Sequence, residues 1–142
     1  MERMDPIEFK QWLESRTRDF AIATLKLLDA LPKKNSTQIV AFQLGKSASS
    51  VGANYREANR AESRVDFGHK LQIAMKEASE SAYWFEVLAG LYPMHRTIKT
   101  LGDEVVELRN LLQSICSSTR RKQSNNFKSN NQTMSLISLE RR

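Results

Sequence analysis

Two acidic side chains on the third predicted helix are the first candidates for chemistry. Glu77 and Glu80 are three residues apart and share a helix face, and Lys70 lies two turns before Glu77. Helical bundles can hold a di-metal centre with Glu and Glu-x-x-His pairs on facing helices. The chain contains no Glu-x-x-His, and the other predicted helices offer no matching inward line of carboxylates. A carboxylate metalloenzyme is therefore the third hypothesis. We interpret both carboxylates as partners of another subunit or of nearby polar side chains, namely Asn54, Arg56 and Lys70.

The remaining reactive side chains do not form a catalytic pattern. Cys116 flanks an apolar stripe and is expected to be a core thiol, and as the single cysteine it fits a reducing, cytoplasmic setting. His69 and His95 lie on different segments, without a second His or Cys at metal-ligand spacing. The five glycines are scattered and make no phosphate-cradling loop. We therefore predict no catalytic residue, no bound metal, no cofactor and no enzymatic activity.

Positive charge is the feature that remains. The chain has 22 Lys and Arg against 16 Asp and Glu, for a net charge of +6. Residues 1–116 hold 16 basic and 15 acidic residues, whereas residues 117–142 hold 6 basic residues and 1 acidic residue. Clustered Lys and Arg neutralise phosphates and release counterions, so this end of the chain is a candidate for nucleic-acid binding. A charged tail also keeps a protein soluble, and that alternative stays open.

Four amphipathic helices are predicted to position these charges. Asp5, Pro6 and Glu8 form a strong helix start, Ser36 is a plausible cap for the second helix, and Ser63 with Asp66 forms a second capping box. Apolar residues recur at steps of three and four through each segment. The helices are expected to span about residues 6–31, 36–60, 64–90 and 96–118.

Short connections make consecutive helices antiparallel neighbours, so the predicted fold is all-α, an up-down-up-down four-helix bundle in residues 1–118. Residues 119–142 are polar, rich in Asn and Ser, and are expected to form a basic, flexible tail. No apolar run approaches the ~20 residues that cross a bilayer, and the N-terminus lacks the features of a signal peptide. We therefore expect a cytoplasmic protein without a membrane partner.

This topology gathers basic residues at one pole of the bundle. The pole combines the start of the first helix, the turn between the second and third helices, and the end of the fourth. The candidate nucleic-acid-binding residues there are Arg56, Arg60, Arg64, Arg120, Arg121 and Lys122, accompanied by Arg3. Acidic residues partly offset them, namely Glu2, Glu57, Glu62 and Asp66. The alternative is a solvated turn bridged by surface ion pairs that are each worth ~0–1 kcal/mol.

Two further patterns concern contacts between helices. A run of small residues surrounds Gly52, and we predict that a neighbouring helix packs closely there, because a glycine costs a helix about 1 kcal/mol relative to Ala. Five aromatic residues exceed what one narrow seam per helix can bury, which predicts contact between subunits. These are Trp12, Tyr55, Tyr83, Trp84 and Phe85. The alternative is a thick core within one monomer.

The segment QLGKSASSVGANYREANRAESRVDFGHKLQIAMKEASESAYWFEVL, about a third of the chain, resembles the four-helix-bundle family encoded within 23S ribosomal RNA intervening sequences. The matching positions are Ser50, Val51, Asn54, Glu57, Ala58, Arg60, Asp66, Phe67, Ile73, Ala74, Lys76, Glu77, Ala78, Glu80, Tyr83 and Trp84. Gly68 stands where a bulkier apolar residue is common. The resemblance implies a bacterial protein with an antiparallel bundle, assembly as a ring-like homopentamer, and no established enzymatic activity.

The resemblance extends to the accessory variability determinant of diversity-generating retroelements, which binds a reverse transcriptase and nucleic acid through basic surfaces. Our leading hypothesis is a non-enzymatic, oligomeric bundle that binds RNA or DNA through its basic pole and tail. The alternative is a protein-interaction adaptor, such as an accessory subunit of a reverse transcriptase in a retroelement.

Overall fold

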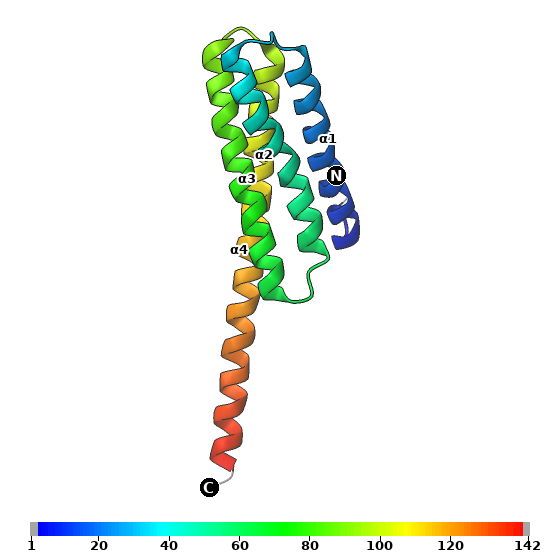
Figure 1. Ribbon diagram of the computed structural model, residues 1–142. Helices are drawn as coiled ribbons and strands as arrows, with labels where there is room; N and C mark the ends of the chain where they lie inside the picture. Colours follow the sequence, from blue (N-terminus) through cyan, green and yellow to red (C-terminus); the bar gives the residue numbers. More distant parts are fainter. Residues whose placement is uncertain (1–2, 141–142) are drawn as a thin grey trace.

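The computed structural model describes residues 3–140, and within that range the chain is all-helical with four helices and no strand (Figure 1). The helices are α1 (Pro6–Ala30), α2 (Asn35–Asn59), α3 (Arg64–Leu91) and α4 (Arg96–Glu140). Each helix packs against the next, and α1 also packs against α4. The predicted up-down-up-down four-helix bundle is therefore confirmed. No helix within residues 3–140 combines the length and the apolar character needed to cross a membrane.

Side chains near the helix starts satisfy the free backbone N–H groups there. The Glu8 N–H donates to Asp5 Oδ1 at 2.8 Å and the Asp5 N–H donates to Glu8 Oε2 at 3.2 Å, which confirms the first capping box. The Asp66 N–H donates to Ser63 Oγ at 3.0 Å, which confirms Ser63 as the α3 cap and gives one of the two hydrogen bonds of the predicted capping box. The prediction of Ser36 as a cap is wrong. The α2 cap is Lys34, whose N–H donates to Thr37 Oγ1 at 2.9 Å, so the hydroxyl that stabilises this start lies one residue further along.

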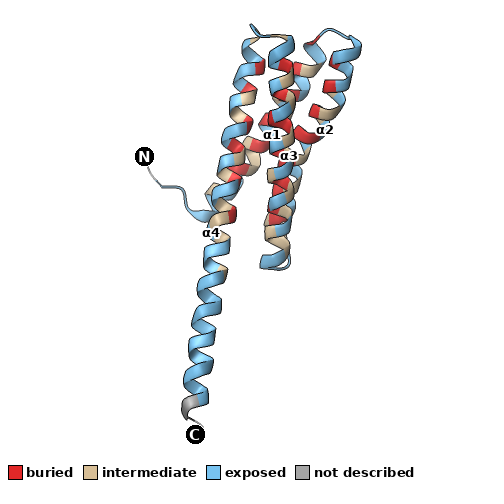
Figure 2. Cartoon of the chain, turned by 90° about the vertical axis from the view of Figure 1, so that its left-hand side faces the viewer, coloured by how far each residue is buried: buried red, intermediate tan, exposed pale blue. Residues whose placement is uncertain are grey.

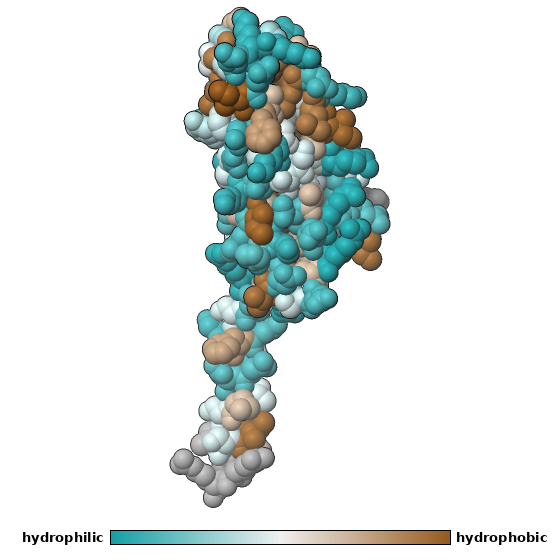
Figure 3. All heavy atoms as spheres, viewed as in Figure 1, coloured by the Kyte–Doolittle hydropathy of each residue, from teal (hydrophilic) through white to brown (hydrophobic). Residues whose placement is uncertain are grey.

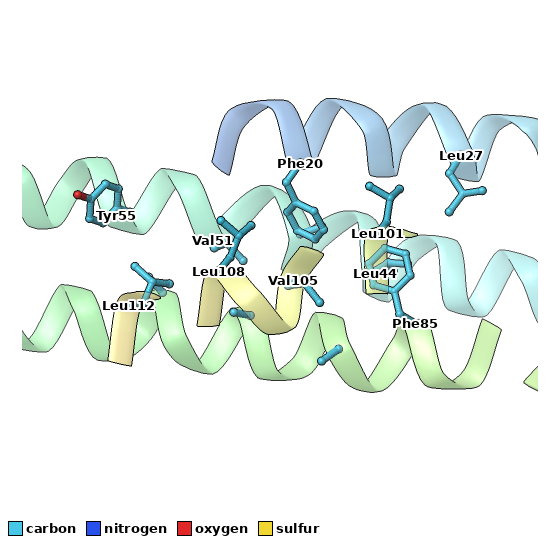
Figure 4. Close-up of a cluster of buried hydrophobic side chains, with 14 of the residues drawn as sticks. Phe20, Leu27, Leu44, Val51, Tyr55, Phe85, Leu101, Val105, Leu108 and Leu112 are labelled. Atoms are coloured by element: carbon cyan, nitrogen blue, oxygen red, sulfur yellow. The ribbon is translucent and has the colours of Figure 1, made fainter. Parts of the chain in front are cut away.

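The core consists of large side chains from all four helices, and Figure 4 shows them meeting along the bundle axis. The Phe20 ring from α1 lies 6.1 Å from the Phe85 ring of α3, measured between centroids. Leu44 from α2 and Leu108 from α4 are fully buried. Burying a side chain of this size stabilises the fold by about 1.5–3 kcal/mol. Buried residues occupy only the inward faces of the helices, as Figure 2 shows, so one hydrophobic core holds the bundle together.

Small residues bring pairs of helices close together. The hydroxyls of Ser47 in α2 and Ser81 in α3 are buried and 2.8 Å apart, which joins the two helices by a hydrogen bond. Gly52 in α2 lies against Thr17 in α1, where a Cβ atom added to the glycine would be 2.8 Å from Thr17 Oγ1. That distance is shorter than real side chains tolerate, so the close contact predicted at Gly52 is confirmed.

The fourth helix is longer than predicted. The expected end near Ser118 is wrong, because α4 continues to Glu140 and residues 119–140 extend beyond the bundle (Figures 1 and 2). We call residues 119–140 the α4 extension. It contains neither Gly nor Pro, so nothing in its sequence breaks a helix that the bundle has already nucleated. The predicted flexibility of residues 119–142 stays a prediction, and Glu2, Arg141 and Arg142 lie outside the described residues.

Candidate functional site

The predicted basic pole corresponds to one end of the bundle. The start of α1, the turn between α2 and α3, and the point where α4 leaves the bundle all lie at this end (Figure 1). The six predicted basic residues do not form one continuous patch there. They divide among two hollows, a groove and the exposed surface.

The first hollow lies between α3 and α4 and brings two of the predicted residues together. It has a volume of about 330 Å³ and is lined by Arg64, His69 and Arg120, with Gln72, Thr119 and Gln123 among its other polar residues. No lining residue that the structure describes is acidic. Arg64 is the first residue of α3, where the helix dipole and free N–H groups favour negative charge. This α3–α4 hollow therefore offers several hydrogen-bond donors to an anionic group such as a phosphate.

A larger groove lies on the other side of α4, between that helix and the start of α1. Its volume is about 880 Å³, and Thr119 lines both this α1–α4 groove and the α3–α4 hollow. Its aromatic lining residues are Phe9, Trp12, Tyr55 and Phe67. Its basic lining residues are Arg3, Lys10 and Lys122. An apolar floor with basic side chains around it is suited to a ligand that has both flat apolar and anionic parts.

An ion-pair clamp between α1 and α4 lies beside this groove. Arg16 Nε donates to Glu104 Oε2 at 3.1 Å, and Arg16 Nη2 lies 3.0 Å from Glu107 Oε2. The hydrogen bonding of Arg16 to the Glu104 carboxylate raises the pKa of the Arg16 guanidinium, although burial opposes it. The guanidinium also lies 5.2 Å from the centre of the Trp12 ring. The clamp therefore joins α1 to α4 and places a guanidinium over one aromatic side chain of the groove.

The floor of the groove also contains two buried polar groups. Burial raises the pKa of the Tyr55 phenol, an interaction with the Asn59 side chain lowers it, and the charge of Glu14 raises it. The Nδ2 atom of Asn59 is buried and has no hydrogen-bond partner within the described residues. A buried donor without a hydrogen-bond partner costs free energy in the folded state.

The other predicted residues lie apart from these two sites. Arg56 turns toward α1 and lines a hollow of about 230 Å³ together with Arg18 and Gly52. Arg60 caps the C-terminus of α2 and is exposed. Arg121 is exposed on the α4 extension. The structure thus pairs Arg64 with Arg120 and groups Lys122 with Arg3, Lys10 and the aromatic floor.

The residues predicted for the site did not include His69, Phe9 or Lys10, and Trp12 was predicted only as apolar surface in excess of what the core can bury. The available signal was an aromatic and basic cluster, Phe9-Lys10-x-Trp12, within one turn at the basic pole. That pattern does not show whether the rings face the core or a groove. The packing of α1 against α4 decides it.

Two side chains predicted as partners of the acidic candidates have other partners, and a contact of Glu77 or Glu80 with another subunit stays a prediction. Lys70 pairs with Glu57 at 3.7 Å, and Asn54 donates to the Ser50 carbonyl at 2.8 Å, so neither pairs with Glu77 or Glu80. Burial and the charge of Glu80 raise the pKa of Glu77. Within residues 3–140, no group of three or more His, Cys, Asp or Glu residues is placed to hold a metal ion.

Comparison with known proteins supports the resemblance. The family model described as 23S rRNA-intervening sequence protein matches residues 10–114. A crystal structure of a protein of unknown function from the S23 ribosomal protein family of Bacteroides thetaiotaomicron is similar to this chain, with 34% sequence identity and a TM-score of 0.67. The similarity covers 73% of this chain and 97% of that one. No curated protein matches the chain. The chain therefore belongs to the 23S rRNA-intervening sequence protein family.

Proposed function

We propose that this protein is a non-enzymatic, oligomeric bundle that binds RNA or other nucleic acid through the basic end of the bundle and the α4 extension. The observation that carries the proposal is the α3–α4 hollow. Arg64 and Arg120, which are far apart in the sequence, line one space with His69, and no acidic residue lines it among the described residues. An arginine can bind a phosphate through two parallel hydrogen bonds, so two arginines around one hollow suit a nucleic-acid backbone.

The α4 extension adds positive charge next to this hollow. Arg120, Arg121 and Lys122 follow one another on the helix, so their side chains point in directions about 100° apart. Arg120 accordingly lines the α3–α4 hollow, whereas Lys122 lines the α1–α4 groove. A nucleic acid can therefore meet cations on both sides of α4. Contacts of this kind bind phosphates without reading base sequence.

Salt-dependent RNA binding tests the proposal. We expect the full chain to bind a structured RNA with an affinity that falls as salt rises, because each phosphate contact contributes about 0.7–0.9 to the slope of log K against log salt. The double variant Arg64→Ala, Arg120→Ala is expected to lose affinity and about 1.4–1.8 of that slope. A charge-matched control, Lys33→Ala with Lys34→Ala, removes two exposed cations at the opposite end of the bundle. Salt-independent binding, no binding, or equal losses in both variants would contradict the proposal.

Oligomerisation is supported by exposed apolar side chains on the bundle. One group lies on α1 and α2, and the other lies on α3, α4 and the loop between them. The exposed residues are Ile22, Leu25, Ile39 and Phe42 in the first group and Tyr83, Leu91, Met94 and Val106 in the second. Figure 3 shows apolar residues gathered near the end of the bundle that is opposite the extension. Two different groups of exposed apolar residues on one protomer suit head-to-tail contacts that close into a ring, including a homopentamer.

Light scattering tests this assembly. We expect the purified chain to be larger than a monomer at micromolar concentration, and Phe42→Asp to dissociate it. Phe127→Asp is a matched control, because Phe127 is exposed to 67% on the α4 extension and Phe42 to 70% on the bundle. A monomeric full chain would contradict the ring.

A second candidate function is an adaptor that binds a reverse transcriptase, as the resemblance to the retroelement accessory protein implies. The exposed apolar faces support a protein partner as well as a second copy. Copurification with a reverse transcriptase encoded beside the gene tests it. A genomic neighbourhood without such a gene would count against this function and leave the nucleic-acid proposal intact.

A further inference from the structure

We propose that the α1–α4 groove binds unpaired nucleotides of a single-stranded nucleic acid, with bases against its aromatic floor and phosphates along its basic rim. This inference rests on the proposed function and names the form of nucleic acid that the site accepts. It assigns binding roles to Phe9, Lys10 and Trp12, which lie outside the candidate set predicted from the sequence.

The floor of the groove supplies flat apolar surfaces from two helices, α1 and α3. The rings of Phe9 and Trp12 in α1 are partly buried, with centroids 5.6 Å apart, and Phe67 of α3 is partly buried beside them. Every nucleobase has a face that can stack on such rings, whatever its identity. The groove volume of about 880 Å³ lies within the range of small-molecule binding sites. The floor can therefore hold unstacked bases.

The basic residues at the rim of the groove favour a negatively charged ligand. Arg3 and Lys10 lie on the N-terminal side, Lys122 lies on α4, and within residues 3–140 none of the three forms an ion pair. Unpaired cations around an apolar floor complement a chain that alternates bases with phosphates. A duplex hides its base faces in its own stack and cannot use the floor.

One further observation fits a strand rather than an isolated nucleotide. Thr119 separates the groove from the α3–α4 hollow, so a strand that leaves the groove across α4 reaches Arg64 and Arg120. The groove and the α3–α4 hollow then bind consecutive parts of one nucleic-acid backbone.

Tryptophan fluorescence tests the proposal directly. The chain has two tryptophans, and Trp84→Phe leaves Trp12 as the only one. In that background we expect an unstructured oligouridylate to quench Trp12, and a fully paired hairpin of equal length to quench it much less. Single-stranded DNA of matching sequence is titrated in parallel. Quenching by either strand supports the proposal, and the tighter of the two identifies the preferred ligand. Equal quenching by hairpin and single strand would overturn it.

Substitutions measure the contribution of the groove. Trp12→Ala is expected to weaken single-strand binding by about 5- to 150-fold, the range for removing one stacked base contact. Phe127→Ala removes an aromatic residue that is exposed on the extension, and we expect less than a twofold change. Lys10→Ala with Lys122→Ala alters two exposed side chains and leaves the core intact, and should reduce the salt slope by about 1.4.

The outcomes separate this inference from the proposed function. If Trp12→Ala and the lysine variant bind single strands normally while Arg64→Ala, Arg120→Ala does not, the groove assignment is wrong and the nucleic-acid function stands. If no nucleic acid binds the full chain, both fail. If Trp12→Ala instead dissociates the oligomer and leaves single-strand affinity unchanged, the groove is a contact between copies and the inference is overturned.

Discussion

The close contact between Gly52 and Thr17 leads to a specific prediction about the packing of α1 on α2. A Cβ atom at position 52 would lie 2.8 Å from Thr17 Oγ1 and 3.1 Å from Thr17 Cβ. Thr17 is fully buried, and its hydroxyl donates to the Leu13 carbonyl at 2.9 Å. A β-branched side chain that is held in this way has little freedom to move aside. Gly52→Ala should therefore force the two helices apart.

The expected change in the free energy of unfolding for Gly52→Ala follows from two opposing contributions. Replacing Gly by Ala within a helix contributes about 1 kcal/mol of stability, and adding a methyl group to a packed contact costs about 1–3 kcal/mol. Gly52→Ala is then expected to lie between no change and a loss of about 2 kcal/mol. Gly68 has no atom within 4 Å of the added Cβ, so Gly68→Ala should keep the full gain of about 1 kcal/mol. The two variants should differ by about 1–3 kcal/mol.

Urea unfolding followed by far-ultraviolet circular dichroism measures this difference, with all variants at one protein concentration because assembly affects apparent stability. Gly45→Ala is a second control, since its Cβ would lie at ordinary contact distances of 3.5 Å from Leu25 and 3.6 Å from Leu28. Adding Thr17→Ala to Gly52→Ala should recover part of the loss, which a double-mutant cycle detects. If Gly52→Ala stabilises the protein as much as Gly68→Ala, the helices are not in close contact there.

Three further predictions concern the core, one partly buried carboxylate and the extension. Ser81→Ala should cost about 1 kcal/mol, and adding Ser47→Ala should cost less than the sum of the single losses, because either single variant already removes the hydrogen bond between the two hydroxyls; strictly additive unfolding energies would contradict this. Because the pKa of Glu77 is raised above its ordinary 4.5, ionising Glu77 destabilises the folded state, and that loss develops as pH rises through the raised pKa. Glu77→Gln should therefore raise the urea midpoint at neutral pH and lose this advantage below about pH 4.5, whereas a pH-independent gain would show a different cause. Leu108→Ala should lower the free energy of unfolding by about 2–5 kcal/mol, because Leu108 is fully buried. Leu136 on the extension is 64% exposed, so Leu136→Ala should change the free energy of unfolding by no more than about 0.5 kcal/mol. A loss at Leu136 comparable to that at Leu108 in thermal unfolding would show that the extension packs against another surface.

Most of the fold could be predicted because local signals and the core pattern agree. Asp5, Pro6 and Glu8 start α1 by satisfying its free N–H groups, and Ser63 does the same for α3. The seam of α3, from Leu71 through Leu88, is buried as its spacing of three and four residues requires. The end of α4 could not be found in this way. Polar composition predicts poor packing but does not by itself end a helix, and residues 119–140 contain neither Gly nor Pro.

The candidate site was only partly predictable. Chain order and short loops suffice to place Arg64 and Arg120 at one pole, because antiparallel neighbours return each helix end to a fixed pole. Arg64 and Arg120 line one hollow, and Arg56 lines another with Arg18. Both arrangements depend on how each helix is rotated about its axis. Sequence spacing gives the angles between side chains on one helix but not the rotation of that helix against its neighbours.

The sequence by itself determined the number, order and polarity of the helices, since capping residues and apolar periodicity act within a few residues of each other. Only the tertiary structure decided where α1 lies relative to α4. Gly52 lets α1 approach α2 closely, while the Arg16 clamp joins α1 to α4 beside the groove that their ends leave between them. The groove leaves Phe9 and Trp12 only partly buried, beside Lys122. It arises from side-chain packing summed over the whole interface, which no local pattern in the chain encodes.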